Sequence, residues 1–232
     1  MSNSVSTSAE TFVRACIRGD IETAARLHQQ GADLEAVWRS CTGLMWAAME
    51  GQTKMVDWLI QAGAEVNVKN EANYTALMYA AESERQAAVM QLLAAGANFR
   101  DRNRYRETIL MTMARYGFTE IVEKLIALGA EVEATNHIGN TALYLAAENG
   151  HVHTVSSLIR AGANVNVRNI GDWTPLMMAS AHGDLATMGL LLEQGADVSP
   201  KNRWGASALS EAKRSVRPVR AAELLQQAGA QE

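Results

Sequence analysis

The chain has 232 residues, of which 48% are hydrophobic and 20% are charged. This balance is typical of a protein that buries a core, and it excludes wholesale disorder. With 21 Lys and Arg against 25 Asp and Glu, the net charge of −4 leaves no basic excess for phosphate groups, so we expect no nucleic-acid binding.

The longest apolar runs, such as those before Glu82 and Glu193, are too short to span a bilayer. Residues 1–11 lack the basic and apolar regions of a signal peptide, so we expect a cytoplasmic protein with no membrane partner. The alternative is export into a host cell as an effector by a specialised secretion system. The two cysteines, Cys16 and Cys41, form no metal spacing and no disulfide framework, which agrees with a reducing compartment.

A regular repeat runs through the chain. The dipeptide Gly-Ala recurs at steps of 32 to 34 residues, at Gly31, Gly63, Gly96, Gly129, Gly162, Gly195 and Gly229. A hydroxyl residue with a leucine two places on recurs every 33 residues, at Thr42, Thr75, Thr108, Thr141, Thr174 and Ser207. Self-similarity at a fixed period of this length indicates a repeat protein.

Each interior repeat is expected to contain two helices and an extended arm. In the repeat that begins at Thr141, this threonine precedes an Ala- and Leu-rich run and is placed to cap a first helix. Gly150 permits the turn that follows, and Leu158 belongs to the apolar stripe of a second helix. Gly162 ends that helix in the left-handed region, and residues 163–173 have the composition of a short arm with a hairpin-like tip.

These residues resemble ankyrin repeats, whose pattern is an arm, the sequence Thr-Pro-Leu-His-x-Ala-Ala, a Gly-His turn and a second helix that ends at Gly-Ala. Residues 174–176 match the opening of this pattern best. The inter-helix glycine is replaced by Glu84 and Val216, and the arm-tip glycine is kept only as Gly139 and Gly205. The motif histidine, with its hydrogen bond to the threonine, is replaced in every copy, by Met45, Met78, Met111, Tyr144, Met177 and Ser210.

The resemblance implies an all-α ankyrin-repeat solenoid of stacked helix-turn-helix repeats with protruding β-hairpin-like arms. We expect residues 1–8 to be a flexible tail and residues 9–232 to form a single domain. The first and last repeats are expected to cap the stack, the last with Pro218 near the start of its second helix. The predicted repeat boundaries are 9–41, 42–74, 75–107, 108–140, 141–173, 174–206 and 207–232.

Catalytic and metal-binding patterns are weak. His151 follows Gly150, where the ankyrin pattern favours histidine as a turn residue, and His153 lies two places further on a solvated position. An i, i+2 pair on a helix points to different faces, unlike the i, i+4 pair of a zinc site. We therefore expect no metal, no cofactor and no catalytic residue. Cys16 is expected in the core and Cys41 exposed at an arm tip, and the methionines at the motif-histidine position are expected to pack between repeats.

In ankyrin proteins, the arm tips and the ends of the first helices line the concave face and touch partners. Tryptophan, tyrosine and arginine at those positions are the side chains that interface centres favour. We predict a hot spot in the middle of the array, at Arg104, Tyr105, Arg115 and Tyr116, flanked by Tyr74 and Trp173. The predicted partner-binding residues are Trp38, Arg39, Tyr74, Arg104, Tyr105, Arg115, Tyr116, Trp173, Arg203 and Trp204.

The resulting hypothesis is a non-enzymatic module, monomeric in isolation, that binds a protein partner through its arm tips and concave face. It would act as an adaptor or scaffold, or as an inhibitor or effector that masks a site on its partner. One alternative is a structural or self-associating repeat module. The other alternative is a metal-dependent enzyme that uses His151 and His153.

Overall fold

A computed structural model describes residues 2–231 of the chain, with side chains from residue 8 onward. The chain divides into two compact halves, Met1–Arg104 and Tyr105–Glu232, and each is described by itself. Both halves are built from helix pairs joined by long arms. None of the helices within residues 2–231 combines the length and the apolar character that a membrane span needs.

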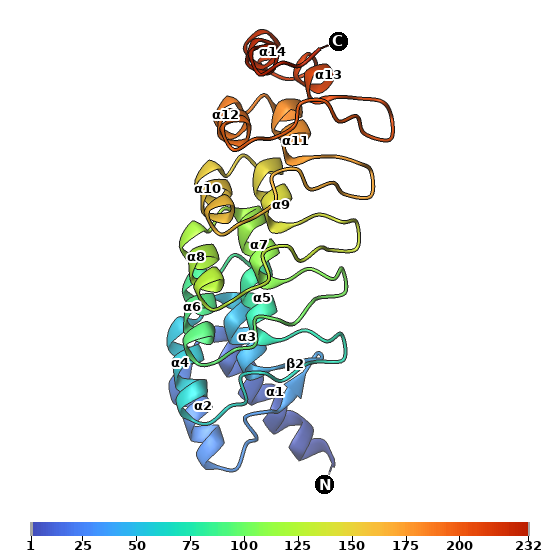
Figure 1. Ribbon diagram of the computed structural model, residues 1–232. Helices are drawn as coiled ribbons and strands as arrows, with labels where there is room; N and C mark the ends of the chain where they lie inside the picture. The colour runs from blue at the N-terminus through green and yellow to red at the C-terminus, as the bar shows by residue number, and fades with distance from the viewer. Residues whose placement is uncertain (1, 232) are drawn as a thin grey trace. The chain divides into compact units, whose positions relative to one another are not determined.

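The first half contains three helix pairs. Its helices pack within pairs, α3 against α4 and α5 against α6, and also between pairs, so that α1, α3 and α5 form one layer and α2, α4 and α6 a second (Figure 1). A two-stranded antiparallel hairpin pairs Val37 with Thr42 and Trp38 with Cys41. The elements are α1 (Ser2–Arg18), α2 (Ile21–Gln29), β1 (Val37–Trp38), β2 (Cys41–Thr42), α3 (Gly43–Glu50), α4 (Thr53–Gln61), α5 (Ala76–Glu82) and α6 (Gln86–Ala94).

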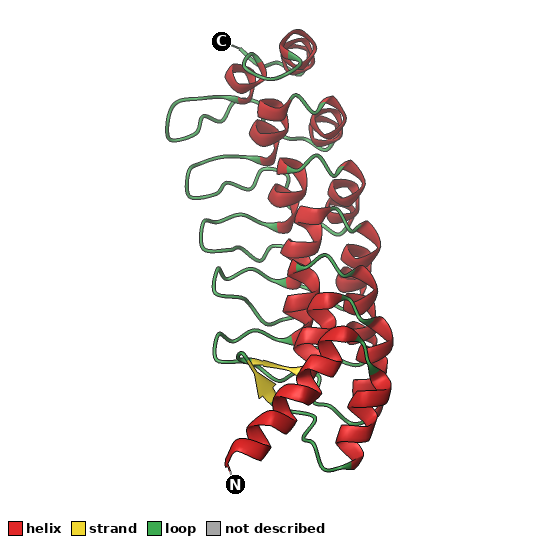
Figure 2. Cartoon of the chain, turned by 180° about the vertical axis from the view of Figure 1, so that it is seen from behind, coloured by secondary structure: helices red, strands yellow, loops and turns green. Residues whose placement is uncertain are grey.

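The second half repeats the arrangement with four helix pairs. The first helices α7, α9, α11 and α13 pack in a row, and the second helices α8, α10, α12 and α14 pack beside them. The arms leave the helices on one side of this half (Figure 2). The elements are α7 (Ile109–Tyr116), α8 (Thr119–Ala127), α9 (Ala142–Glu148), α10 (Val152–Arg160), α11 (Pro175–His182), α12 (Leu185–Glu193), α13 (Ala208–Ala212) and α14 (Pro218–Gln227).

The hydroxyl residue of each repeat caps its first helix, as predicted. In all six copies the side-chain oxygen accepts a hydrogen bond of 3.2–3.3 Å from the backbone N–H three residues on. This bond pairs one of the N–H groups that the first turn of a helix leaves unused. At the last copy the cap is reciprocal, because Ser210 Oγ accepts from Ser207 N–H at 2.9 Å.

The core lies between the two helix layers of each half. The leucine that follows each cap by two places is at most 2% exposed in all six copies. The methionines at the motif-histidine position are at most 3% exposed, so their predicted role in packing is confirmed; they are Met45, Met78, Met111 and Met177.

Two expectations for the first half are corrected. Helix α1 begins at Ser2, so residues 2–8 are helical and do not form a separate tail, since no glycine or proline interrupts them. Residue 1 lies outside the described part. Cys41 is 6% exposed, not open at an arm tip, because its Sγ lies 3.3 Å from Tyr79 Oη, and Asn70 Nδ2 donates to the same tyrosine oxygen at 2.9 Å.

The turn between the two helices of a repeat requires a left-handed residue. Gly51, Gly117, Gly150 and Gly183 supply it with φ between 64° and 73°. Glu84 occupies the same place with φ 59°. A residue with a Cβ is strained in this conformation, whereas glycine adopts it readily.

Replacing this glutamate should therefore stabilise the protein. We expect Glu84→Gly to raise the free energy of unfolding by about 1 kcal/mol, because it removes the strain at a position where glycine stands in the other repeats. Urea denaturation followed by circular dichroism measures the change. Glu84→Ala is the matched control, since it removes the charge but keeps the Cβ; an equal gain from alanine would show that the charge and not the backbone causes the strain.

Candidate functional site

An asparagine shapes four of the arms. Asn136 Oδ1 accepts hydrogen bonds from Ile138 N–H at 3.1 Å and from Asn140 N–H at 3.0 Å, and Asn136 N–H donates to the Asn140 carbonyl at 3.1 Å. These bonds close the turn and direct the residues between them outward. The same pair of bonds to residues two and four places on is formed by Asn70, Asn169 and Asn202. Sequence analysis did not single out this asparagine row, although it keeps the spacing of the repeat.

The arms of the second half expose a row of large apolar side chains. Their exposed fractions are 43% for Tyr105, 40% for Ile138, 49% for Ile170 and 75% for Trp204. We call these four residues the arm-tip row. Sequence analysis named Tyr105 and Trp204 as binding residues but passed over the two isoleucines, because it weighed only aromatic and arginine side chains at the tips.

Backbone hydrogen bonds join neighbouring arms along this row. His137 N–H donates to the Tyr105 carbonyl at 3.1 Å, Ile170 N–H donates to the Ile138 carbonyl at 3.0 Å, and Arg203 N–H donates to the Gly171 carbonyl at 3.1 Å. The tips are therefore tied to one another as well as to their own helices. A surface held in this way loses little conformational entropy when it binds a partner.

The predicted hot spot is only partly exposed. Tyr105 is open and lies beside the His137 ring, with 5.8 Å between centroids. Arg115 instead forms an ion pair with the buried carboxylate of Glu107, which also accepts from Asn136 Nδ2 at 3.2 Å. The half-buried Tyr116 lies beside Phe118, with 5.9 Å between ring centroids. Of the three side chains in this half, Tyr105 is thus the most accessible to a partner.

The first half holds four of the predicted residues. Arg104 and Arg39 are exposed, whereas Trp38 is half-buried between the guanidinium groups of Arg14 and Arg39, at 5.1 and 4.4 Å from its ring centroid. The expectation of an accessible aromatic side chain at Tyr74 is wrong.

Tyr74 is only 8% exposed. Its hydroxyl donates to Glu82 Oε1 at 2.8 Å, and its ring lies 5.2 Å from that of Tyr79. The side chain therefore turns inward and braces the arm against helix α5.

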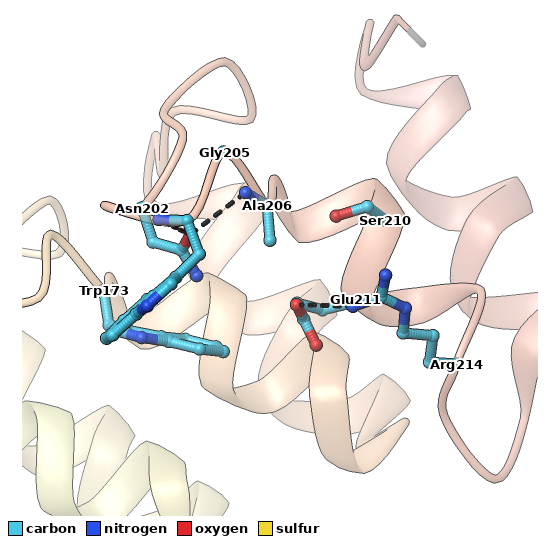
Figure 3. A pocket seen from close by; sticks show the side chains of 8 residues that line it. Trp173, Asn202, Gly205, Ala206, Ser210, Glu211 and Arg214 are labelled. Atoms are coloured by element: carbon cyan, nitrogen blue, oxygen red, sulfur yellow. Dashed lines mark hydrogen bonds and ion pairs between the residues drawn. The ribbon is translucent and has the colours of Figure 1, made fainter.

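Two of the remaining three predicted residues, Trp173 and Trp204, line an open hollow of about 300 Å³ in the second half. The other lining residues are Asn202, Gly205 and Ala206 of the arm and residues of α13 and the turn after it, and Figure 3 shows the Trp173 ring extending toward Glu211. Arg203 stands beside Trp204 and lies 3.7 Å from Asp172. The hollow is bounded by two indoles, an amide, a carboxylate and the guanidinium of Arg214.

Two carboxylates near α9 differ in their partners. Glu107 is buried but hydrogen-bonded, as described above, whereas Glu148 is half-buried and accepts no hydrogen bond from residues 8–231. Burial raises the pKa of Glu148 above its usual 4.5, and the positive charges of Arg115 and His182 oppose that shift. Burial, with a smaller contribution from the charge of Glu148, also raises the pKa of Tyr144.

His151 and Cys16 are held by their surroundings in the fold, whereas His153 is not. His151 Nε2 lies 2.9 Å from the Arg115 carbonyl, and its ring fills the space above Gly117, where a Cβ would come within 2.5 Å of it. His153 is exposed. Burial raises the pKa of the Cys16 thiol to about 12, so the reactive thiolate form is suppressed at neutral pH. Among the described residues there is no group of three or more His, Cys, Asp and Glu side chains that could hold a metal ion.

Comparison with known proteins identifies the repeat. The family model described as ankyrin repeats (3 copies) matches residues 12–103 and 110–202. A search of curated proteins found no significant match. Among solved structures, the crystal structure of the human ASB11 ankyrin repeat domain is similar, with 25% sequence identity, a TM-score of 0.79, and coverage of 95% of this chain and 98% of that one.

The raised pKa of Glu148 predicts that replacing this residue with glutamine stabilises the protein in a pH-dependent way. Because the folded protein holds this pKa above the value in the unfolded chain, the charged carboxylate destabilises the fold at neutral pH, and this penalty disappears as the pH falls below 4.5. Glu148→Gln should therefore raise the unfolding temperature at pH 7 and leave it nearly unchanged at pH 4. Glu120→Gln, on an exposed site of α8, is the control; a gain of the same size there would contradict the role of burial.

Proposed function

The chain belongs to the ankyrin repeat family, and from this we propose that it is a non-enzymatic interaction module that binds a protein partner through the arms of its second half. Ankyrin repeats generally act as protein–protein interaction modules. The observation that carries the proposal for this chain is the arm-tip row, because it places four large apolar side chains at the ends of consecutive arms, where no packing against the core requires them.

The composition of this surface favours a protein partner. Large exposed apolar side chains in a connected group mark binding surfaces more often than scattered single ones do. Tyrosine and tryptophan at the two ends of the row combine a broad ring with a hydrogen-bonding group, which is the property that makes them frequent anchors at interface centres. Arg203, next to Trp204, adds a charged group at the rim.

The geometry of the row supports binding without rearrangement. The backbone bonds between neighbouring arms fix the distance between successive tips, and the asparagine turns fix the direction in which they point. In the first half, Trp38 and its two flanking arginines supply a second exposed surface of similar chemistry. We retain the seven predicted repeats as the division of the chain, with the first and last as caps.

Adaptor or scaffold action and inhibition by masking both follow from the same binding event, and they differ only in what the partner does. The protein acts in the cytosol as a monomer in this proposal, which agrees with two cysteines that form no disulfide.

A pull-down tests the proposal. We expect a protein captured from the lysate of the source organism by the wild-type chain to be lost with the double variant Tyr105→Ala, Trp204→Ala. Removing two interface anchors should lower the affinity by roughly 2 kcal/mol or more, whereas exposed truncations leave the unfolding temperature nearly unchanged.

Two controls make this result interpretable. Leu128→Ala removes another exposed apolar side chain of the second half, at the end of α8, and should retain the partner. Leu143→Ala should destabilise the fold by roughly 2–5 kcal/mol. It is the control for a loss of binding that is caused by unfolding. Identical protein lists from the double variant and from Leu128→Ala would contradict the proposed surface, and capture of only further copies of this chain would indicate self-association.

A further inference from the structure

The arm asparagines also use their amide nitrogens, with one exception. Asn136 Nδ2 donates to Glu107 at 3.2 Å, and Asn169 Nδ2 donates to Asn140 Oδ1 at 3.0 Å. In each case the acceptor is the last residue of the preceding repeat and stands directly before a threonine cap. Asn202, the next member of the row, donates no hydrogen bond from Nδ2 to any residue within 8–231.

The exception has a simple cause. The position before the cap that holds Glu107 and Asn140 in earlier repeats holds Trp173 in the repeat before Asn202. An indole has a donor but no acceptor, so the Asn202 amide cannot be satisfied in the same way. The Asn202 side chain is otherwise enclosed, with 6% exposure, and it lines the hollow beside Trp173 (Figure 3).

The orientation of this amide is fixed by the arm. Asn202 Oδ1 accepts from Trp204 N–H and from Ala206 N–H, both at 3.0 Å, so the opposite side of the amide must present its NH₂ group. This NH₂ group has no protein partner within residues 8–231 and faces the open hollow, so a ligand that brings an acceptor can form a hydrogen bond with it. The hollow therefore contains one preset hydrogen-bond donor.

The other groups around the hollow are mostly donors too. The Trp173 and Trp204 indoles each carry an N–H that no described residue accepts. The Arg214 side chain is 75% exposed and forms an ion pair with Glu211 at 3.6 Å, which leaves further guanidinium N–H groups open to solvent. Glu211 is the one carboxylate among the lining residues, and Arg214 faces it. This set fits a ligand that is rich in acceptors.

Two indole rings supply the apolar walls. A Cβ at Gly171 would lie 3.1 Å from Trp173 Cδ1 and 3.3 Å from Trp204 Cζ3, so both rings approach the same point of the arm backbone. Trp204 still exposes 75% of its surface, which leaves one ring face for a partner. The volume of about 300 Å³ suits one or two side chains rather than a large ligand.

We propose that the hollow binds an acidic side chain in an extended segment of the protein partner. The carboxylate accepts from Asn202 Nδ2 and from the Arg214 guanidinium, and a neighbouring apolar side chain of the segment packs on Trp204. This inference rests on the proposed function and names the chemistry of the partner. It favours an acidic peptide over nucleic acid, because a hollow of about 300 Å³ holds one or two side chains and the chain has no basic excess along which a phosphate backbone could lie.

Calorimetric titration with short synthetic peptides tests the proposal. The full chain is titrated with a peptide of glutamate and leucine, with its lysine and leucine counterpart, and with a single-stranded oligonucleotide. We expect only the acidic peptide to bind and the affinity to fall with added salt. In ¹⁵N spectra, the indole signals of Trp173 and Trp204, assigned by Trp→Phe substitution, should shift, and those of Trp46 and Trp58 should not.

Three variants measure the separate contributions of Asn202, Arg214 and Glu211 to peptide binding. Asn202→Asp keeps the oxygen that holds the arm but removes the donor, and Arg214→Gln removes the guanidinium; each should weaken the acidic peptide roughly tenfold or more. Glu211→Gln removes the repelling carboxylate and should strengthen binding. Arg160→Gln makes the same charge change as Arg214→Gln on α10 and should have no effect. Circular dichroism confirms that Asn202→Asp is folded, and Arg214→Gln tests the site independently of it.

The outcomes distinguish this proposal from the one it rests on. Binding of the lysine peptide or of the oligonucleotide alone, or weaker binding of the acidic peptide by Glu211→Gln, would overturn the acidic ligand. A natural partner that is lost with the Tyr105 and Trp204 double variant but kept by Asn202→Asp and Arg214→Gln would overturn the hollow as a binding site while leaving the arm surface in place.

Discussion

Four of the arms depend on one asparagine oxygen each. In Asn70, Asn136, Asn169 and Asn202 this oxygen accepts two backbone N–H groups of the same turn. A turn that left these groups unpaired would lose about 1–3 kcal/mol for each one removed from water. Because both bonds come from a single side chain, the same turn forms in these four arms. The exposed tip residues Ile138, Ile170 and Trp204 follow from this constraint, since each stands one or two places after its asparagine.

The structural features that the sequence predicts best are those whose interactions are formed within a few consecutive residues. The cap at Thr141 needs only its own oxygen and an N–H three residues on, so the position of the threonine was enough to predict it. The fate of Tyr74 was different. Its place in the repeat is that of Trp173, but its hydroxyl reaches Glu82, which stands eight residues later at the end of α5, and this bond turns the ring inward. The place of a residue in the repeat predicts where its side chain is attached, but it does not predict which other side chain it contacts.

In some repeats a side chain at the end of the arm pairs with a side chain at the end of the first helix, and this pairing determines whether the arm side chain is available to a partner. Where the residue before the cap and the residue seven places after it are complementary, as in Tyr74 with Glu82 and Glu107 with Arg115, the pair is satisfied within the protein. At Trp173 no such pair is formed, because alanine stands at the corresponding place on α11. The family resemblance was sufficient for the fold, since six of the seven predicted repeats keep the cap and the core leucine. It was insufficient for the site, since these pairs vary from repeat to repeat.

The NH₂ group of Asn202, which has no protein acceptor, makes the hollow more favourable for some ligands than for others. While the hollow is filled with water, the Asn202 NH₂ group keeps a solvent partner and costs the fold little. A purely apolar occupant would cover the two indoles but would also displace that water and leave the donor unpaired, so part of its gain from burial would be lost. An occupant that brings a carboxylate replaces the water with a charge-assisted bond and keeps the apolar contact. The substitution of an acceptor by Trp173 thus gives one arm of the repeated scaffold a chemical preference that its neighbours do not have.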